Sequence, residues 1–169
     1  MAATVEVDEE NGKSSSPVLT HNVSNSNMGS ADASSLNPID NPIVPGRNSF
    51  EKWQLIHVID MSTSSSINNI RVWRSGSLGA NAIHLTNASV SSYGKEAKYR
   101  TPTDSTSPVA VFSMPTSSPG SANLGIGGSL TGSLTAAGYS DFLVHQIQTT
   151  PAAMAGSTTV MNYQFDETA

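Results

Sequence analysis

Histidine is the residue type in this chain with the widest chemical use, because an imidazole can bind a metal ion or move a proton near neutral pH. The four histidines are His21, His57, His84 and His145. No two are four residues apart, as in a helical zinc-binding pair, and no compact metal-ligand spacing occurs. His57 and His145 lie in predicted strands that could be neighbours. We expect structural imidazoles bonded to backbone carbonyl groups, and no metal site.

Motifs for a nucleophile or a phosphate are also missing. The chain has 28 serines and no Gly-x-Ser-x-Gly elbow. Residues 125–128 read GIGG, but Ser, Gly and Thr follow instead of the helix that a dinucleotide loop needs. The sequence therefore predicts no catalytic residue, no cofactor and no enzymatic activity.

Trp73 is the aromatic side chain best suited to an exposed role, since Arg71 and Arg74 flank it. An exposed tryptophan beside cations can stack on a sugar ring or anchor a protein contact. Arg71, Trp73 and Arg74 are therefore candidate interaction residues, although core packing is the role that we favour for Trp73. Trp53, near the start of the strand-rich part, is expected in the core.

Composition excludes several kinds of partner. The net charge of −5 gives no electrostatic footprint for nucleic acid. No apolar run approaches the roughly 18 residues of a membrane span, and the acidic start has no apolar signal segment. Without cysteine there are no disulfides or thiolate sites. Charged residues make up only 12%, which suits β-sheet surfaces and surfaces that neighbouring subunits cover.

The two ends of the chain differ in composition. Residues 1–49 hold four prolines among Asn, Ser and Asp, a density that blocks helix and central strand alike. We expect an extended N-terminal arm there, ordered mainly on assembly, and a β-sandwich domain over residues 50–169. Disorder is the alternative for the arm. Its candidate docking residues are apolar: Val5, Val7, Leu36, Ile39, Ile43 and Val44.

The second part contains short apolar or alternating runs separated by Ser, Thr, Gly and Pro. Residues 52–61 are apolar on both faces, which predicts a central strand buried on both sides. The last two runs indicate either a closing hairpin or two strands in facing sheets. No convincing amphipathic helix occurs, so the sequence predicts an all-β, antiparallel β-sandwich, Ig-like or jelly-roll. The predicted strands include residues 52–61, 67–73, 82–88, 109–112, 141–149 and 157–166.

Three stretches resemble small structural proteins of tailed bacteriophage virions. They are residues 48–53 with 67–73, residues 121–128 running into 135–141, and the ending from residue 148 to 167. The run YSDFLVHQIQ at residues 139–148 belongs to the same likeness. The resemblance covers about residues 48–167 and implies a β-sandwich core, oligomeric placement in a virion, and no catalytic residues.

Together, these observations predict a non-enzymatic virion protein, made in the host cytoplasm and assembled in several symmetric copies at the neck, collar or tail. Its arm would dock on other virion proteins, such as capsid, portal or tail subunits, and a homo-oligomer is expected. A capsid decoration (cement) protein is the first alternative. A carbohydrate-binding module at a fibre or surface tip, using Trp73, is the second.

Overall fold

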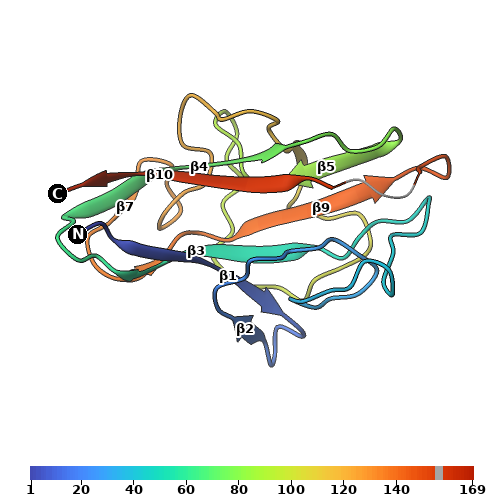
Figure 1. The fold of residues 1–169 in the computed structure, drawn as a ribbon, viewed down its shortest axis with the longest axis horizontal. Coiled ribbons are helices and arrows are strands. Elements are labelled where there is room, and N and C mark those ends of the chain that lie inside the picture. Colours follow the sequence, from blue (N-terminus) through green and yellow to red (C-terminus); the bar gives the residue numbers. More distant parts are fainter. Residues whose placement is uncertain (155–157) are drawn as a thin grey trace.

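The structure is a computed structural model, and it describes residues 1–154 and 158–169. Two antiparallel sheets pack face to face (Figure 1). The larger has seven strands in the order β2-β1-β3-β9-β5-β6, with β8 also paired to β3; the smaller has the order β10-β4-β7. The strands are β1 Thr4–Asn11, β2 Val18–Thr20, β3 Lys52–Asp60, β4 Ser66–Ser75, β5 Ala82–Thr86, β6 Phe112–Ser113, β7 Ser133–Leu134, β8 Gly138–Tyr139, β9 Leu143–Thr149 and β10 Val160–Thr168.

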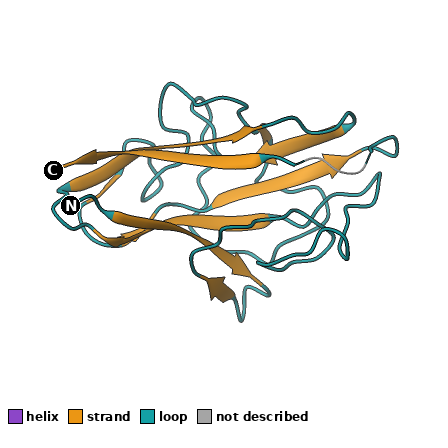
Figure 2. Ribbon diagram, viewed as in Figure 1, coloured by secondary structure: helices purple, strands orange, loops and turns teal. Residues whose placement is uncertain are grey.

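The predicted all-β, antiparallel sandwich is confirmed. The residues that the structure describes form strands and loops and no helix (Figure 2). Accordingly, this part of the chain offers no helix with the length and apolarity that crossing a membrane requires.

Strand β3 is buried on both faces, as its apolar run predicts. Its inner face carries Ile56, which packs with Ile70 of β4 and Leu143 of β9 between the sheets. Its outer face carries Trp53, which packs with Phe142 and with Ala110 from the loop before β6. Both faces are covered because the second sheet lies on one side and this loop on the other, so apolar residues are favoured on both faces.

Strand β4 keeps its apolar side chains inward through a bulge. Ile67, Ile70 and Val72 are all buried although the first two are three residues apart, which a regular strand would place on opposite faces. Asn69 between them has a left-handed backbone (φ 53°), and the register with β10 shifts at this point. The extra residue turns both isoleucines into the core.

The N-terminal segment is part of the sandwich, which corrects the expected boundary at residue 49. Strand β1 lies between β2 and β3 and pairs with β3 from Thr4 to Glu10. Val5 and Val7 pack against the core. The apolar and polar residues alternate along β1, so one face closes the sandwich and the other faces outward. Over β1 there is therefore no separate arm that could become ordered on assembly.

The last two long strands lie in facing sheets, as one of the two alternatives predicted. Strand β9 belongs to the larger sheet, while β10 forms one edge of the smaller sheet. Residue 157, the first of the predicted 157–166 strand, lies outside the described residues. Among the residues described, β10 pairs with β4 on one side and with no strand on the other. Both chain ends lie at the same end of the sandwich (Figure 1).

Candidate functional site

Four ligand-type side chains meet on the outer face of strands β1 and β3. Glu6 and Asp8 are two residues apart on β1 and therefore point to the same side. His57 lies on β3 directly opposite Glu6, and His21 follows β2. One potential ligand atom from each side chain lies within 4.8 Å of the other three. We call these residues, Glu6, Asp8, His21 and His57, the outer cluster.

All the close contacts in the outer cluster are made by four atoms, one from each side chain. His57 Nδ1 is 3.0 Å from Glu6 Oε1 and 3.0 Å from Asp8 Oδ2. His21 Nδ1 is 2.8 Å from the same Asp8 oxygen and 3.4 Å from the same Glu6 oxygen. Two imidazole nitrogens and two carboxylate oxygens therefore alternate around a common centre.

Neighbouring groups hold the ligands in place. The Asp8 side chain is fully buried, and its second oxygen, Oδ1, accepts a hydrogen bond of 3.1 Å from the Asn22 backbone N–H. The Tyr139 ring stacks on His57 with centroids 4.2 Å apart. Partial burial and the charges of Asp8 and Glu6 raise the pKa of Tyr139, so this ring stays neutral beside the carboxylates. His21 is the open side of the cluster, since 56% of its side chain is exposed.

Sequence reasoning missed the outer cluster for a clear reason. Its members are far apart along the chain, and three of them, Glu6, Asp8 and His21, stand in the segment that was expected to be an extended arm. The alternation of Val5 and Val7 with Glu6 and Asp8 is the signal that could have found it. That pattern places both carboxylates on one face of a strand.

The other two histidines form an inner pair, in a polar layer between the sheets. His84 Nε2 lies 2.8 Å from His145 Nδ1, and His145 Nε2 lies 3.1 Å from Gln54 Oε1. The Gln54 amide nitrogen donates to Glu9 Oε2, so its oxygen is an acceptor. His145 therefore donates from Nε2 and accepts at Nδ1 from the Nε2–H of His84. His57 and His145 are on adjacent strands but on opposite faces.

Burial keeps the inner pair neutral. Loss of solvent lowers the pKa of His84 to about 3, and the positive charge of Arg74 contributes. The pKa of His145 is lowered well below 6.5, chiefly by burial and also by His84 and Lys52. The expectation of backbone carbonyl partners is wrong for both histidine pairs, because each ring contacts side chains.

The arginines flanking Trp73 are engaged in the fold. Arg71 forms an ion pair with Asp166 of β10, and Arg74 is buried and donates to the Gly76 carbonyl. Trp73 itself is half-buried on the outer face of the smaller sheet, opposite Asn162 of β10. Trp53 is buried, as predicted.

The predicted docking residues divide into three groups. Val5 and Val7 pack against the core, and Leu36 is buried. Ile43 is half-buried. Ile39 and Val44 remain exposed, at 85% and 55% of their surface. The exposed candidates in the N-terminal segment therefore lie in its loop after β2.

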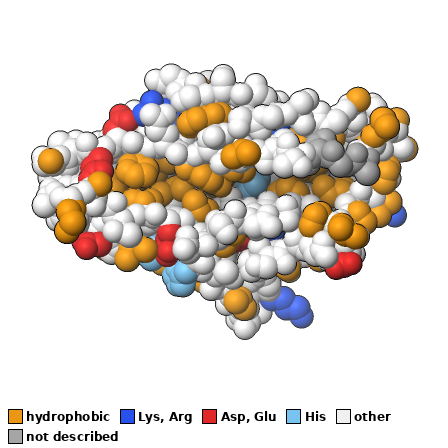
Figure 3. Space-filling model, in the orientation of Figure 1, with side chains coloured by type: hydrophobic (Ala, Val, Ile, Leu, Met, Phe, Trp, Pro, Cys, Tyr) orange, Lys and Arg blue, Asp and Glu red, His pale blue; other side chains and the backbone are white. Residues whose placement is uncertain are grey.

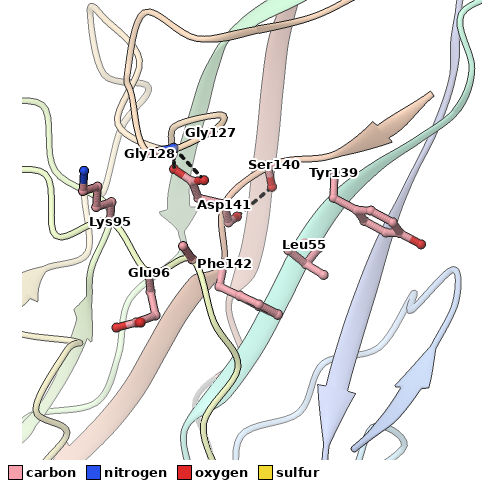
Figure 4. A pocket seen from close by; sticks show the side chains of 10 residues that line it. Leu55, Lys95, Glu96, Gly127, Gly128, Tyr139, Ser140, Asp141 and Phe142 are labelled. Carbon is pink, nitrogen blue, oxygen red and sulfur yellow. Dashed lines mark hydrogen bonds between the residues drawn. The ribbon is translucent and has the colours of Figure 1, made fainter. Parts of the chain in front are cut away.

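The glycine run at residues 125–128 lines an open pocket of about 580 Å³ (Figure 4). The Gly128 backbone N–H donates to both carboxylate oxygens of Asp141 at 2.9 Å. The Tyr93 hydroxyl donates to the same carboxylate at 2.8 Å, and burial together with this bond raises the pKa of Tyr93. The glycine turn thus holds the chain's own carboxylate where a phosphate loop would hold its ligand. Tyr139 turns its ring away from the pocket toward the N-terminal strands (Figure 4).

No protein-family profile, curated protein or solved structure matches this chain at a significant level. The resemblance to phage virion proteins therefore stays a prediction from the sequence.

Proposed function

We propose that this chain is a non-enzymatic structural component of a tailed phage virion, present in several symmetric copies at the neck, collar or tail. It would join other virion proteins through its strand edge and through the exposed loop after β2. A capsid decoration protein would use the same surfaces. The free edge of β10 is the observation that carries this proposal.

Strand β10 is long for an unprotected edge. It spans Val160–Thr168, and the described residues place no strand beside it opposite β4. Residues 160–165 contain no charge and no proline, which are the usual devices that stop edge-to-edge pairing. The first charges come at Asp166 and Glu167. A natural edge of this kind favours β-strand addition by a neighbouring subunit.

An apolar seam runs beside this edge. Met161, Tyr163 and Phe165 of β10 and Val5 and Val7 of β1 are only partly buried, although they pack on the core. Figure 3 shows hydrophobic side chains along the gap between the two sheets on this side of the molecule. A subunit paired with β10 would cover part of this seam and so add hydrophobic stabilisation.

The chemistry of the pocket also favours a structural role. Asp141, its buried carboxylate, is engaged by the Gly128 N–H and the Tyr93 hydroxyl. A carboxylate with its oxygens already bonded is poorly placed to take a proton from a substrate.

The solution mass of the full-length protein tests the proposal. We expect a discrete oligomer by light scattering, and dissociation in the double variant Val160→Lys/Gln164→Lys, because edge lysines oppose strand pairing. Val111→Lys is the matched control, since Val111 is 55% exposed beside β6 and Val160 is 58% exposed on β10. The control should keep the oligomer.

A monomer at all concentrations would contradict self-assembly. Glycan binding by that monomer, abolished by Trp73→Ala, would favour the carbohydrate-binding module instead. Deleting residues 1–45 would not test docking alone, because it removes β1, which lies between β2 and β3 in the larger sheet.

A further inference from the structure

We propose that the outer cluster is a binding site for one divalent transition-metal ion of the Zn²⁺ type, held by Glu6 Oε1, Asp8 Oδ2, His21 Nδ1 and His57 Nδ1. The inference is independent of the proposed function. It rests on the distances between these atoms, on the count of hydrogens available to them, and on the types of ligand present.

The distances fit an ion at the centre. The four measured nitrogen–oxygen separations run from 2.8 to 3.4 Å. A point equidistant from four atoms with such separations lies about 2 Å from each, which is the length of Zn–N and Zn–O bonds.

Hydrogen bonds account for only two of the four contacts, His21 to Asp8 and His57 to Glu6. Each imidazole has at most one hydrogen on Nδ1, yet His57 Nδ1 faces two carboxylate oxygens, both at 3.0 Å. His21 Nδ1 faces the same two oxygens. The Glu6 and Asp8 oxygens both carry negative charge, and both point toward the centre of the outer cluster. A single central cation would interact favourably with all four atoms at once.

The ligand types select the class of metal. Imidazole nitrogen with carboxylate oxygen suits Zn²⁺ and its late first-row neighbours. Ca²⁺ and Mg²⁺ prefer six or more oxygen ligands, and only two oxygens face this centre. We therefore expect Zn²⁺ to bind in preference to Mg²⁺.

The surroundings provide the support and the access that such a site requires. The Asn22 N–H fixes the non-ligating oxygen of Asp8, and the stacked Tyr139 ring sets the plane of His57. His21 is more than half exposed, so an ion can enter from solvent past this ring. Figure 3 shows histidine at the surface on the side of β1, close to acidic side chains.

A bound ion would fasten the turn after β2 to the sheet. His21 comes from that turn, whereas the other three ligands come from β1 and β3. Strand β2 pairs with β1 over only three residues, Glu9 to Asn11. Metal binding would therefore stabilise this short edge strand of the larger sheet, because the ion binds the folded chain better than the unfolded one.

The experiment is calorimetric titration of ZnCl₂ into untagged, chelator-treated full-length protein, with thermal unfolding beside it. We expect one ion per chain and a rise in Tm of about 5–10 °C at a hundredfold excess over Kd. MgCl₂ should leave Tm unchanged. Co²⁺ in place of Zn²⁺ should give the visible absorption of a four-coordinate site.

The variants His21→Ala and His57→Phe should each weaken Zn²⁺ binding by at least about tenfold, the scale of losing a metal ligand or its support. His21→Ala is the safer of the two for folding, because that side chain is exposed. Glu10→Gln is the matched control, since Glu10 lies on the same face of β1, two residues beyond Asp8, and it should bind as the parent does. The absence of Zn²⁺ binding, or binding unchanged in both histidine variants, would overturn the proposal.

Discussion

Strands β1 and β3 carry two polar clusters, one on each face, and the two differ in how their charges are satisfied. On the inner face, the buried Glu9 carboxylate accepts from Lys52 at 2.7 Å, Gln54 at 3.1 Å, Asn11 at 3.2 Å and Ser26 at 3.0 Å. Each oxygen of the Glu9 carboxylate has donors of its own, since Oε1 accepts from Lys52 and Asn11 and Oε2 accepts from Gln54 and Ser26. In the outer cluster, two carboxylates share two imidazoles. The same strands thus present a closed network inward and a set of converging ligands outward.

The difference follows from burial. A charge between the sheets is stable only when its partners are fixed in place, because no water can replace a missing one. The loop after β2 completes the inner network, since the Ala33 carbonyl accepts from Lys52. The outer cluster can exchange partners with solvent through His21. A polar group inside this sandwich therefore serves the fold, and one outside is available for a ligand.

The largest effect should come from breaking the inner network. We expect Lys52→Met to lower the free energy of unfolding by about 3–5 kcal/mol, because it leaves the Glu9 charge buried without its cation. Lys52 is 1% exposed and Glu9 is fully buried. Urea unfolding of the full chain measures the change.

The control is the ion pair of Arg100 with Glu96, in which the Arg100 side chain is 56% exposed and the Glu96 side chain is 12% exposed. The Arg100 side chain is more than half exposed, so Arg100→Met should change stability by less than about 1 kcal/mol. Equal losses in the two variants would show that burial does not separate the two kinds of charge in this protein.

The second effect is a loss of stability in mild acid. The unfolded chain takes up a proton on each histidine below about pH 6.5, whereas folded His84 does so only near pH 3. Between these values the unfolded state binds more protons, so the free energy of unfolding falls as the pH is lowered. The slope is about 1.4 kcal/mol per pH unit for each histidine kept neutral in this way.

Urea titrations from about pH 7 to pH 5.5 cover the upper part of this window, where few carboxylates titrate. The His84→Gln variant should lose about one histidine's share of the slope. A slope in the variant equal to that of the parent would contradict the assignment of this pH dependence to the inner pair.

The sequence predicted the fold better than the site, and particular residues show why. The central β3 and the facing β9 and β10 follow from runs such as residues 52–61, where local apolar pattern and final burial agree. Strand β1 was assigned to an arm because of its charged residues and the prolines after it, whereas β3 of the same chain supplies the partner that makes it a strand of the sandwich. Pairing of distant segments sets that partner, and local pattern does not encode it.

The contacts of the two histidine pairs could not be predicted from the sequence for the same reason. His57 and His145 stand on paired strands, yet the register places them on opposite faces, and a shift of one residue would have exchanged their surroundings. The sequence predicts the strands but not their register, so it could not show which carboxylates each ring would meet.

The smallest change in stability is expected from a substitution of Tyr139 beside the outer cluster. Tyr139 stacks on His57 at 4.2 Å with an interplanar angle of 18°, and it is 39% exposed. Tyr139→Leu keeps an apolar side chain but removes the ring, so we expect a loss of roughly 0.5–1.5 kcal/mol, the value of an aromatic contact beyond its buried area.

The test of that value is a double-mutant cycle of Tyr139→Leu with His57→Phe, measured by urea unfolding without metal. A phenyl ring at position 57 can still stack on Tyr139 but cannot face Glu6 and Asp8. If the stacking alone stabilises this edge, Tyr139→Leu will have the same effect with either ring. If Tyr139 acts by orienting the imidazole toward the carboxylates, its effect will shrink in the His57→Phe background, because that background has no imidazole to orient.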